Sequence, residues 1–307
     1  MAAIPLLLLG TGAAGCDAGG SDRTAGAGAS AVESGYPLAV ADCDGREVLL
    51  EKRPERIVIV GPPLYAEVVV DLGAADRVAG RTVSPESPPA LDGIESVGKP
   101  LGWSLEKVVT LRPDLVLGAV GKEARRLRAL GIPVLTTGRP GGRVSGLEDV
   151  IESIRTIDRA LHGSDERSAP RIAAIRRRVE ATAERVRGRP RPRAAFIYAP
   201  REYAPTAAGR ETPEHELIEL AGAENAFAAM DGYGSIGLEP LILSDPDAIV
   251  TSDDQVAQIA GEPRLAGMRA VREGRVIGIR SSRIASTRFA STLEALAEML
   301  HPEAVAR

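Results

Sequence analysis

The side-chain types that most often catalyse reactions or hold metal ions are scarce in this chain. It has three histidines, His162, His215 and His301, and two cysteines, Cys16 and Cys43. Zinc and manganese sites bring several histidine, cysteine or carboxylate ligands together, and His162 and His301 fall at the expected ends of helices. Two cysteines also exclude a disulfide framework. We therefore expect no metal site and no bound cofactor.

The candidates for catalysis are equally weak. Ser235 lies within Gly232–Gly237, but a nucleophile elbow needs glycine two residues before the serine, where this chain has Tyr233. The same segment formally matches a dinucleotide-binding string. No strand is expected before it, so we interpret it as a flexible turn that presents Tyr233. Asp253 and Asp254 are typical of a helix cap. The sequence does not predict an enzyme.

The first sixteen residues resemble an export signal, because the apolar run Ile4–Leu9 is followed by small residues and then Cys16. Gly10–Gly15 has the spacing of a dinucleotide fingerprint, but residues 17–30 have the composition of a flexible linker where that motif needs a helix. Residues 13–16 instead resemble the lipobox of bacterial lipoproteins. No Lys or Arg precedes the apolar run, so an ordinary secretory signal and a cytoplasmic protein stay as alternatives.

We accordingly expect a lipoprotein signal peptide over residues 1–15 and a flexible linker over 16–35. Cys16 is then the lipidated residue, and the protein is extracytoplasmic and anchored to the cell membrane. Cys43 would have no partner, and we expect a free thiol in or near a strand. No later stretch reaches the ~18 uninterrupted apolar residues of a transmembrane helix.

The composition predicts a folded chain with an aliphatic core. Of its 307 residues, 44% are hydrophobic, 26% are charged and 3% are aromatic. The length favours two lobes over one minimal domain. A net charge of -4 argues against a surface that binds nucleic acid.

The first half of the chain alternates short strands and helices. Tyr36–Leu50 predicts a hairpin that turns at Asp44-Gly45. The remaining expected elements are strands at 56–60, 78–80, 115–117 and 133–135, and helices at 64–72 and 122–130. Such alternation indicates a parallel α/β sheet covered on both faces.

Residues 168–187 predict a helix about 30 Å long. Its apolar residues recur every three or four positions, at Ile172, Ile175, Val179, Ala183 and Val186. Strands at 194–198, 248–250 and 276–279 and helices at 213–220 and 287–300 follow it. We expect two Rossmann-like α/β lobes joined by this one helix; a single sheet with one more surface helix is the alternative.

The expected boundaries are an N-terminal lobe over 36–165, the connecting helix over 166–190 and a C-terminal lobe over 191–307. A single helix between the lobes also suggests lobe motion of small amplitude. This hypothesis follows from the stiffness of one continuous helix compared with two or three loose crossovers.

A repeat links the two halves at a constant offset of 133 residues. Leu105-Glu106 precedes Pro113-Asp114 and an apolar strand, and Leu238-Glu239 precedes Pro246-Asp247 and another. Each copy predicts a short helix with a glutamate in its first turn. The helix dipole favours an acidic residue there by ~0.3 to 1 kcal/mol, which is the structural explanation of either glutamate alone. Their matched positions on two lobes favour a shared role.

From about Tyr36 to the C-terminus, the chain resembles the substrate-binding lipoproteins of ABC importers for ferric siderophores, haem and cobalamin. The segments that carry this resemblance are 56–60, 72–80, 104–117, 209–210, 217–226, 238–239, 246–247 and 300–303. In this family two α/β lobes are joined by one long helix, the class III periplasmic-binding-protein fold, and the ligand lies between the lobes.

The resemblance implies a monomer that captures a metal chelate and delivers it to an ABC permease and its ATPase. Ferric siderophore is the expected ligand, and cobalamin or haem is the alternative. A two-lobed chelatase-like enzyme is a remote third possibility. Glu106 and Glu239 correspond to the paired glutamates that dock onto permease arginines. Exposed ion pairs contribute little energy each, so their implied role is orientation and recognition.

Ligands of parallel α/β lobes approach the carboxyl ends of the strands. The loops expected there are 61–65, 81–89, 100–103, 137–143, 199–210, 231–236 and 280–288. They hold aromatic residues, which offer contact area, and arginines, which offer forked donors to anionic or carbonyl rims. The predicted ligand-binding residues are Tyr65, Arg81, Trp103, Arg139, Tyr203, Arg210, Tyr233 and Arg288, with Arg280 and Arg283 in the same loops. Tyr65, Tyr233 or His215 is a candidate for direct haem ligation.

Overall fold

Two six-stranded sheets organise the chain in this computed structural model, which describes residues 35–199 and 204–304. The first sheet is parallel except for its edge pair β5 and β6. Its strand order is β6 (Gly102–Trp103), β5 (Ser96–Lys99), β4 (Val78–Thr82), β3 (Ile57–Ile59), β7 (Leu115–Leu117) and β8 (Val134–Leu135). The central strands β3 and β7 are buried at every position, as expected for a sheet covered on both faces.

The second sheet is mixed. Strands β9, β11, β13 and β14 pair in parallel, whereas β10 and β12 pair antiparallel. Its order is β12 (Tyr233–Ser235), β10 (Thr206–Ala208), β9 (Arg193–Tyr198), β13 (Ala248–Ser252) and β14 (Val276–Ile279), with β11 (Glu224–Asn225) also paired to β9. The expectation of a flexible turn at 232–237 is wrong in part, because Tyr233–Ser235 is held as a strand against β10.

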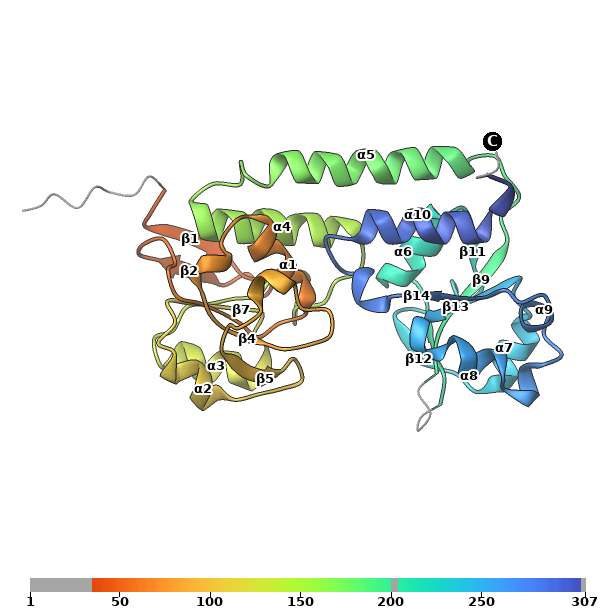
Figure 1. Cartoon of the computed structure of the whole chain (residues 1–307), viewed down its shortest axis with the longest axis horizontal. Coiled ribbons are helices and arrows are strands. Elements are labelled where there is room, and N and C mark those ends of the chain that lie inside the picture. The colour runs from red at the N-terminus through yellow and green to blue at the C-terminus, as the bar shows by residue number, and fades with distance from the viewer. Residues whose placement is uncertain (1–34, 200–203, 305–307) are drawn as a thin grey trace, which may run out of the picture. The chain divides into compact units, whose positions relative to one another are not determined.

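Ten α-helices are described with these sheets (Figure 1). They are α1 (Pro63–Asp71), α2 (Leu105–Thr110), α3 (Gly121–Ala129), α4 (Leu147–His162), α5 (Ala169–Val186), α6 (Pro213–Leu220), α7 (Leu238–Ser244), α8 (Val256–Ala260), α9 (Arg269–Arg272) and α10 (Phe289–Leu300). We call the first sheet with α1 to α4 the N-terminal lobe, and the second sheet with α6 to α10 the C-terminal lobe.

The long helix α5 lies in sequence between the two sheets and packs on α10 and α4 (Figure 1). Its predicted apolar face is buried at Ile172, Ile175, Val179 and Val186. The two oxygens of Glu294 on α10 accept from the Arg178 guanidinium at 2.8 and 2.6 Å. The fold is therefore two α/β lobes connected by one long helix, as the sequence predicts.

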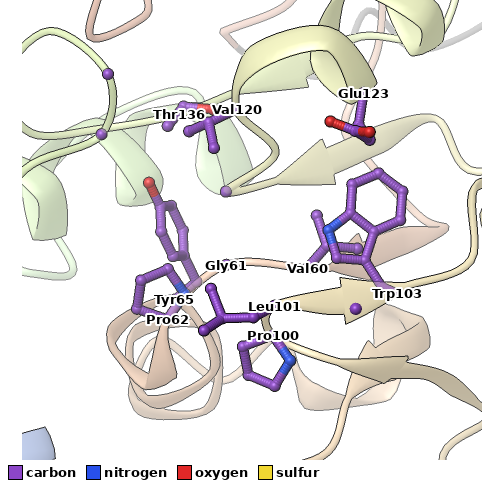
Figure 2. Close-up of a pocket in the computed structure, with 14 residues that line it drawn as sticks. Val60, Gly61, Pro62, Tyr65, Pro100, Leu101, Trp103, Val120, Glu123 and Thr136 are labelled. Carbon is purple, nitrogen blue, oxygen red and sulfur yellow. The ribbon is translucent and has the colours of Figure 1, made fainter. Parts of the chain in front are cut away.

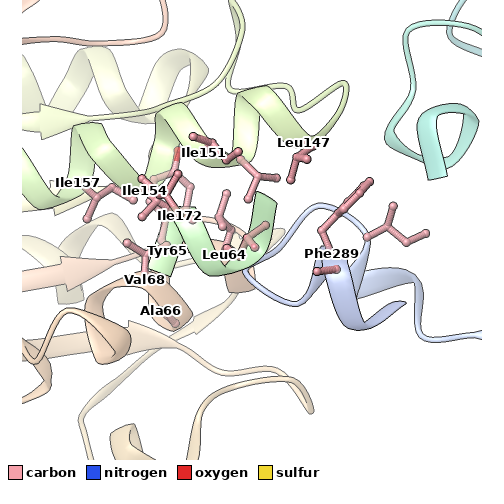
Figure 3. Close-up of a cluster of buried hydrophobic side chains, with 14 of the residues drawn as sticks. Leu64, Tyr65, Ala66, Val68, Leu147, Ile151, Ile154, Ile157, Ile172 and Phe289 are labelled. Atoms are coloured by element: carbon pink, nitrogen blue, oxygen red, sulfur yellow. The ribbon is translucent and has the colours of Figure 1, made fainter. Parts of the chain in front are cut away.

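Helix α4 has no counterpart among the predicted elements. Its buried apolar residues Ile151, Ile154, Ile157 and Leu161 are spaced three or four apart, and Val150 precedes them on the same buried face. This spacing is the helical signal that the sequence interpretation overlooks. Figure 3 shows the isoleucines of α4 packed with side chains of α1, which is the core that supports the first pocket described below.

The hairpin is confirmed as β1 (Leu38–Ala41) and β2 (Glu47–Leu50). Oδ1 of Asp42 accepts from the backbone N–H groups of Asp44 and Arg46, at 2.9 and 2.8 Å, and so holds the turn. Cys43 lies in this turn as a half-buried free cysteine. Burial raises the pKa of its thiol, so the unreactive protonated form is favoured.

The Pro-Asp repeat performs the same structural task in both lobes. Asp114 accepts from the backbone N–H of Arg56 at 2.9 Å, and Asp247 accepts from that of Arg193 at 2.7 Å. The guanidinium of Arg56 donates to the Leu111 carbonyl, and that of Arg193 donates to Ser244, which is 133 residues further on. Each copy thereby ties the end of its short helix to the chain entering the lobe's first parallel strand.

Candidate ligand-binding site

A cavity of about 460 Å³ opens in the N-terminal lobe beside Trp103. Its walls come from the segments that follow β3, β5, β7 and β8, which is the edge where α/β sheets bind ligands. Figure 2 shows Trp103 and Glu123 on one side of the cavity and the Tyr65 ring across from them. Leu101, fully exposed at 104% of its reference area, and Val120 add apolar surface at the mouth.

Two glycines make room for this cavity where β3 and β7 end. A Cβ on Gly118 would lie 2.5 Å from the Cα of Gly61 and 3.0 Å from the Tyr65 ring. Gly118 also has a φ of +84°, in the left-handed region that favours glycine. The two loops can approach each other closely only without side chains, and the Tyr65 ring covers the point of contact.

Tyr65 is the second residue after the start of α1 rather than a loop residue, and only 4% of it is exposed. Its hydroxyl oxygen accepts from the backbone N–H of Thr137 at 2.8 Å and from Thr137 Oγ1 at 3.2 Å. Burial raises the pKa of this phenol. The arrangement makes Tyr65 a fixed neutral wall of the pocket, because metal ligation through its oxygen would require these contacts to break.

A second cavity of about 180 Å³ adjoins the first and is lined from both lobes. The two cavities share Pro62, Tyr65 and Gly142. The C-terminal lobe contributes Pro213, Glu214, Tyr233, Ser281 and Ala285. The candidate site is therefore a larger chamber in the N-terminal lobe that leads to a smaller one lined from both lobes.

Glu214 is the principal polar group of the second cavity, and the sequence interpretation does not identify it. The side chain is in the first turn of α6, and 3% of the residue is exposed. Oε1 accepts from the Tyr198 hydroxyl at 2.8 Å and Oε2 accepts from the Tyr233 hydroxyl at 2.6 Å. Burial raises the pKa of this carboxyl, and the two tyrosine hydrogen bonds act in the opposite direction.

The two tyrosines differ in exposure. Tyr233 is 53% exposed, whereas Tyr198 is half-buried, and their ring centroids lie 6.4 Å apart. Burial raises the pKa of both phenols, with the negative Glu214 carboxyl as the next cause. Both hydroxyls therefore stay protonated and donate to Glu214. Tyr233 lines the second cavity, but its oxygen is engaged and not free to ligate a metal.

The structure does not gather the predicted arginines at the cavities. Arg139 pairs with Asp149 at 2.9 Å, Arg210 with Asp231 at 2.8 Å and Arg288 with Glu67 at 3.5 Å. Arg280 lies 3.8 Å from Glu86 and 3.9 Å from Asp253. None of these four, nor Arg283, lines either cavity.

The structure contradicts the predicted ligand contact of Arg81. Its side chain is buried within the N-terminal lobe, where Nε donates to the Leu91 carbonyl at 2.9 Å and Nη2 approaches Asp92 Oδ1 at 3.4 Å. Arg81 lies one residue before the end of β4, and there its side chain turns into the lobe rather than toward the edge that carries the loops.

Several predicted residues occupy other places. Tyr203 and Cys16 lie outside the described residues. His215 is half-buried on α6, where its Nδ1 contacts the Asn225 side chain at 3.2 Å, and it lines neither cavity. Within 35–199 and 204–304, no group of three or more His, Cys, Asp or Glu side chains could hold a metal ion.

Glu106 and Glu239 lie in the first turns of α2 and α7, one in each lobe. Both are exposed, and no hydrogen bond or ion pair of either carboxylate is found in the described part of the chain. Both side chains are therefore available to a partner.

Contacts between the lobes surround the second cavity. Glu67 on α1 is buried and accepts from the backbone N–H of Thr287 at 3.1 Å and from its hydroxyl at 2.8 Å. Glu216 on α6 accepts from the backbone N–H of Leu147, at the start of α4, at 2.6 Å. These bonds join the two lobes.

Comparison with known proteins agrees with this architecture. The family model described as "Periplasmic binding protein" matches residues 58–282. An uncharacterized ABC transporter substrate-binding lipoprotein of Bacillus subtilis, YvrC, is 26% identical over 87% of this chain and 87% of its own length. A cobalamin-binding protein of Halobacterium salinarum is 30% identical over 70% of this chain and 58% of its own.

A solved structure of an ABC-type Fe3+-hydroxamate transport system from Saccharomonospora viridis superposes with a TM-score of 0.75. It is 28% identical, and the match covers 86% of this chain and 99% of that one. Residues 58–282, which the family model matches, run from β3 through the connecting helix to β14. The chain thus belongs to the periplasmic binding protein family, as an extracytoplasmic substrate-binding protein of an ABC transporter.

Proposed function

We propose that this protein captures a metal chelate between its two lobes and delivers it to an ABC permease, with a ferric siderophore of the hydroxamate type as the leading ligand. The observation that carries the proposal is the aromatic-walled chamber at Trp103 and Tyr65, which adjoins a smaller cavity lined from both lobes. Aromatic and apolar walls suit a compact chelate, and a few placed polar groups suit its orientation.

A corrinoid is the second candidate. The named function of the Halobacterium salinarum relative supports it, as does the broad apolar mouth of the chamber at Leu101 and Val120. Like a hydroxamate chelate, a corrinoid presents a large surface rimmed by neutral amide or carbonyl groups. The third possibility from the sequence, haem, depends on propionate partners and on an axial ligand, and the described cavities offer no arginine and no free tyrosine or histidine for these roles.

The membrane attachment and the docking mode complete the proposal. The lipobox resemblance at Cys16 supports a lipid anchor, and no described helix is long and apolar enough to cross a bilayer. We propose a monomer that presents Glu106 and Glu239 to permease arginines. Nothing in the cavities pairs a nucleophile with a base, so we propose transport without catalysis.

Titration of the intrinsic fluorescence tests the ligand directly, because Trp103 is the sole tryptophan and lines the chamber. We expect a ferric hydroxamate or cyanocobalamin to quench it with a Kd below about 10 μM, about -7 kcal/mol. Calorimetry on Trp103→Phe controls for inner-filter effects. Failure of every ferric hydroxamate, ferric catecholate, ferric citrate, haem and corrinoid tested would overturn the proposal.

The anchor is tested separately. Wild type is expected to partition with membranes after expression in a bacterial host, and Cys16→Ala is expected to be released. Membrane association of Cys16→Ala would contradict a lipid anchor at this residue.

A further inference from the structure

The two cavities have an unusual charge balance for a chain with 38 basic residues. Among the described residues that line them, the charged side chains are Glu123 in the first cavity and Glu214 in the second. None of the arginines and lysines in the described part of the chain lines either cavity. The inner surface of the site is therefore negative or neutral throughout its described part.

Four arginines in the loops and the pocket beside the cavities have acidic partners. Arg288 pairs with Glu67 and Arg280 with Glu86, both across the boundary between the lobes. A third pocket shares Val120, Thr136 and Gly141 with the first and contains Arg46, Arg125 and Arg128. Two of these pair with the aspartates of the hairpin, Arg46 with Asp44 and Arg128 with Asp42, each at 2.9 Å.

Glu214 is built into the site rather than placed on its rim. Each of its oxygens accepts one tyrosine hydroxyl, at 2.8 and 2.6 Å. Two donors on two separate oxygens match the ionised carboxylate, which accepts at both, whereas a protonated carboxyl would itself donate from one of them. Tyr198 and Tyr233 thus hold a negative group against the ligand space without neutralising it.

We infer that the site selects chelates that carry no net negative charge, and that Glu214 is the residue that rejects anionic ones. The inference rests on the proposed function and specifies its ligand class. Neutral or cationic hydroxamate chelates and amide-rimmed corrinoids fit it. Tris-catecholate iron, ferric citrate and haem with ionised propionates do not, because their charges would be placed beside a carboxylate and away from water.

A charge series on one chelate tests the inference in the wild-type protein. Ferrioxamine B has a free ammonium group, its N-acetyl derivative is neutral and its N-succinyl derivative carries a carboxylate, while the iron centre stays the same. We expect the affinity to follow the order cationic, neutral, anionic, with about a tenfold loss or more between the first and the last. Cyanocobalamin and its monocarboxylate derivatives form an equivalent pair for a corrinoid.

Two variants separate the role of Glu214 from a general effect of the site. Glu214→Gln keeps the size and an acceptor, and we expect it to bring the anionic derivative to within about twofold of the neutral one. Glu211→Gln removes the charge of an exposed glutamate close to α6 that lines neither cavity, and this variant should keep the preference. Circular dichroism and the unfolding midpoint of each variant show whether the fold is retained; the wild-type series does not depend on them.

The outcomes distinguish this inference from the proposed function. Equal or tighter binding of the anionic derivative by wild type would overturn the charge selection and leave chelate binding intact. An unchanged preference in folded Glu214→Gln would overturn the assignment of the selection to Glu214. If neither the ferrioxamine series nor the corrinoids bind at all, and anionic chelates do not bind either, the proposed function itself fails.

Discussion

The two lobes are alike where they are expected to meet the permease and different where they line the ligand site. In both, a short helix with an exposed first-turn glutamate leads through Pro-Asp to a parallel strand, and the aspartate holds the chain entering the sheet. At the ligand site, the N-terminal lobe offers an apolar chamber around Trp103, and the C-terminal lobe offers a carboxylate held by two tyrosines.

This difference suggests a division of labour. In the proposed division, the N-terminal lobe provides contact area for the ligand, and the C-terminal lobe selects against ligands with a negative charge. The proposed docking would present the repeated ends to one transporter, whereas the ligand-facing loops differ between the lobes. The following predictions test the likeness first and then the difference.

The largest effect is expected at the repeated glutamates. In Glu106→Ala with Glu239→Ala, transport should fall to background, because the permease would lose both charges that orient the protein on it, while ligand affinity stays unchanged. Uptake of radiolabelled iron chelate by whole cells measures transport, and fluorescence titration measures ligand affinity. The exposed pair Glu47→Ala with Glu180→Ala is the matched control. Normal uptake by the first double variant would remove the functional meaning of the repeat.

A smaller effect is expected on ligand affinity, to which the two lobes should contribute unequally. Trp103→Ala should weaken chelate binding by about 2 kcal/mol, because it removes the main aromatic wall of the chamber, and Tyr233→Ala by about 1 kcal/mol, because half of that ring is exposed. Isothermal titration calorimetry on both variants checks the order. A larger loss in Tyr233→Ala would reverse the proposed division of labour.

The aspartates of the repeat should matter about equally for stability. Asp114→Ala leaves the backbone N–H groups of Glu55 and Arg56 without their acceptor, and Asp247→Ala does the same to that of Arg193. We expect each to lower the free energy of unfolding by about 1 to 2 kcal/mol, measured by urea titration. Asp→Asn at each position retains an acceptor and should lose less. Destabilisation in one lobe alone would show that the repeat is only a sequence likeness.

The smallest effect concerns one buried histidine per lobe. His162 accepts at Nε2 from Arg77 and contacts Asp158 through Nδ1, and His301 donates through Nε2 to the Ala221 carbonyl. Burial lowers the pKa of both. The unfolded chain therefore binds protons first as the pH falls below about 6.5, so stability should decrease from there toward the lowered native pKa values. Urea unfolding midpoints at pH 7.5 and 5.5 measure this loss of stability. The midpoints of His301→Gln should differ less between the two pH values than those of wild type.

Local patterns in the sequence predict most of the fold. The alternation of apolar runs and the spacing of Ile172, Ile175 and Val179 locate the sheets and the connecting helix, and the Pro-Asp repeat identifies the family resemblance. Helix α4 has an equally regular apolar spacing and could have been found in the same way. These features depend on residues close together in the chain.

The site is less predictable because its key contacts join residues that are distant in sequence. Arginine near a loop is not evidence of a ligand contact, since Arg288 pairs with Glu67 and Arg280 with Glu86 across more than half of the chain. Glu214 resembles an ordinary first-turn glutamate, and its importance follows from Tyr198 and Tyr233, which reach it from two strands. The sequence points to Trp103 and Tyr233 because aromatic residues are rare here and both precede a repeat glutamate, and each of them lines a cavity.

Hydrogen-deuterium exchange with and without bound ferrioxamine B, or cyanocobalamin if that chelate binds more tightly, tests the central claim most directly. If the ligand lies between the lobes, the amides of β6 at Gly102–Trp103 and of β12 at Tyr233–Ser235 should both gain protection on binding. Protection confined to one lobe, with the other unchanged at saturating ligand, would contradict capture between the two.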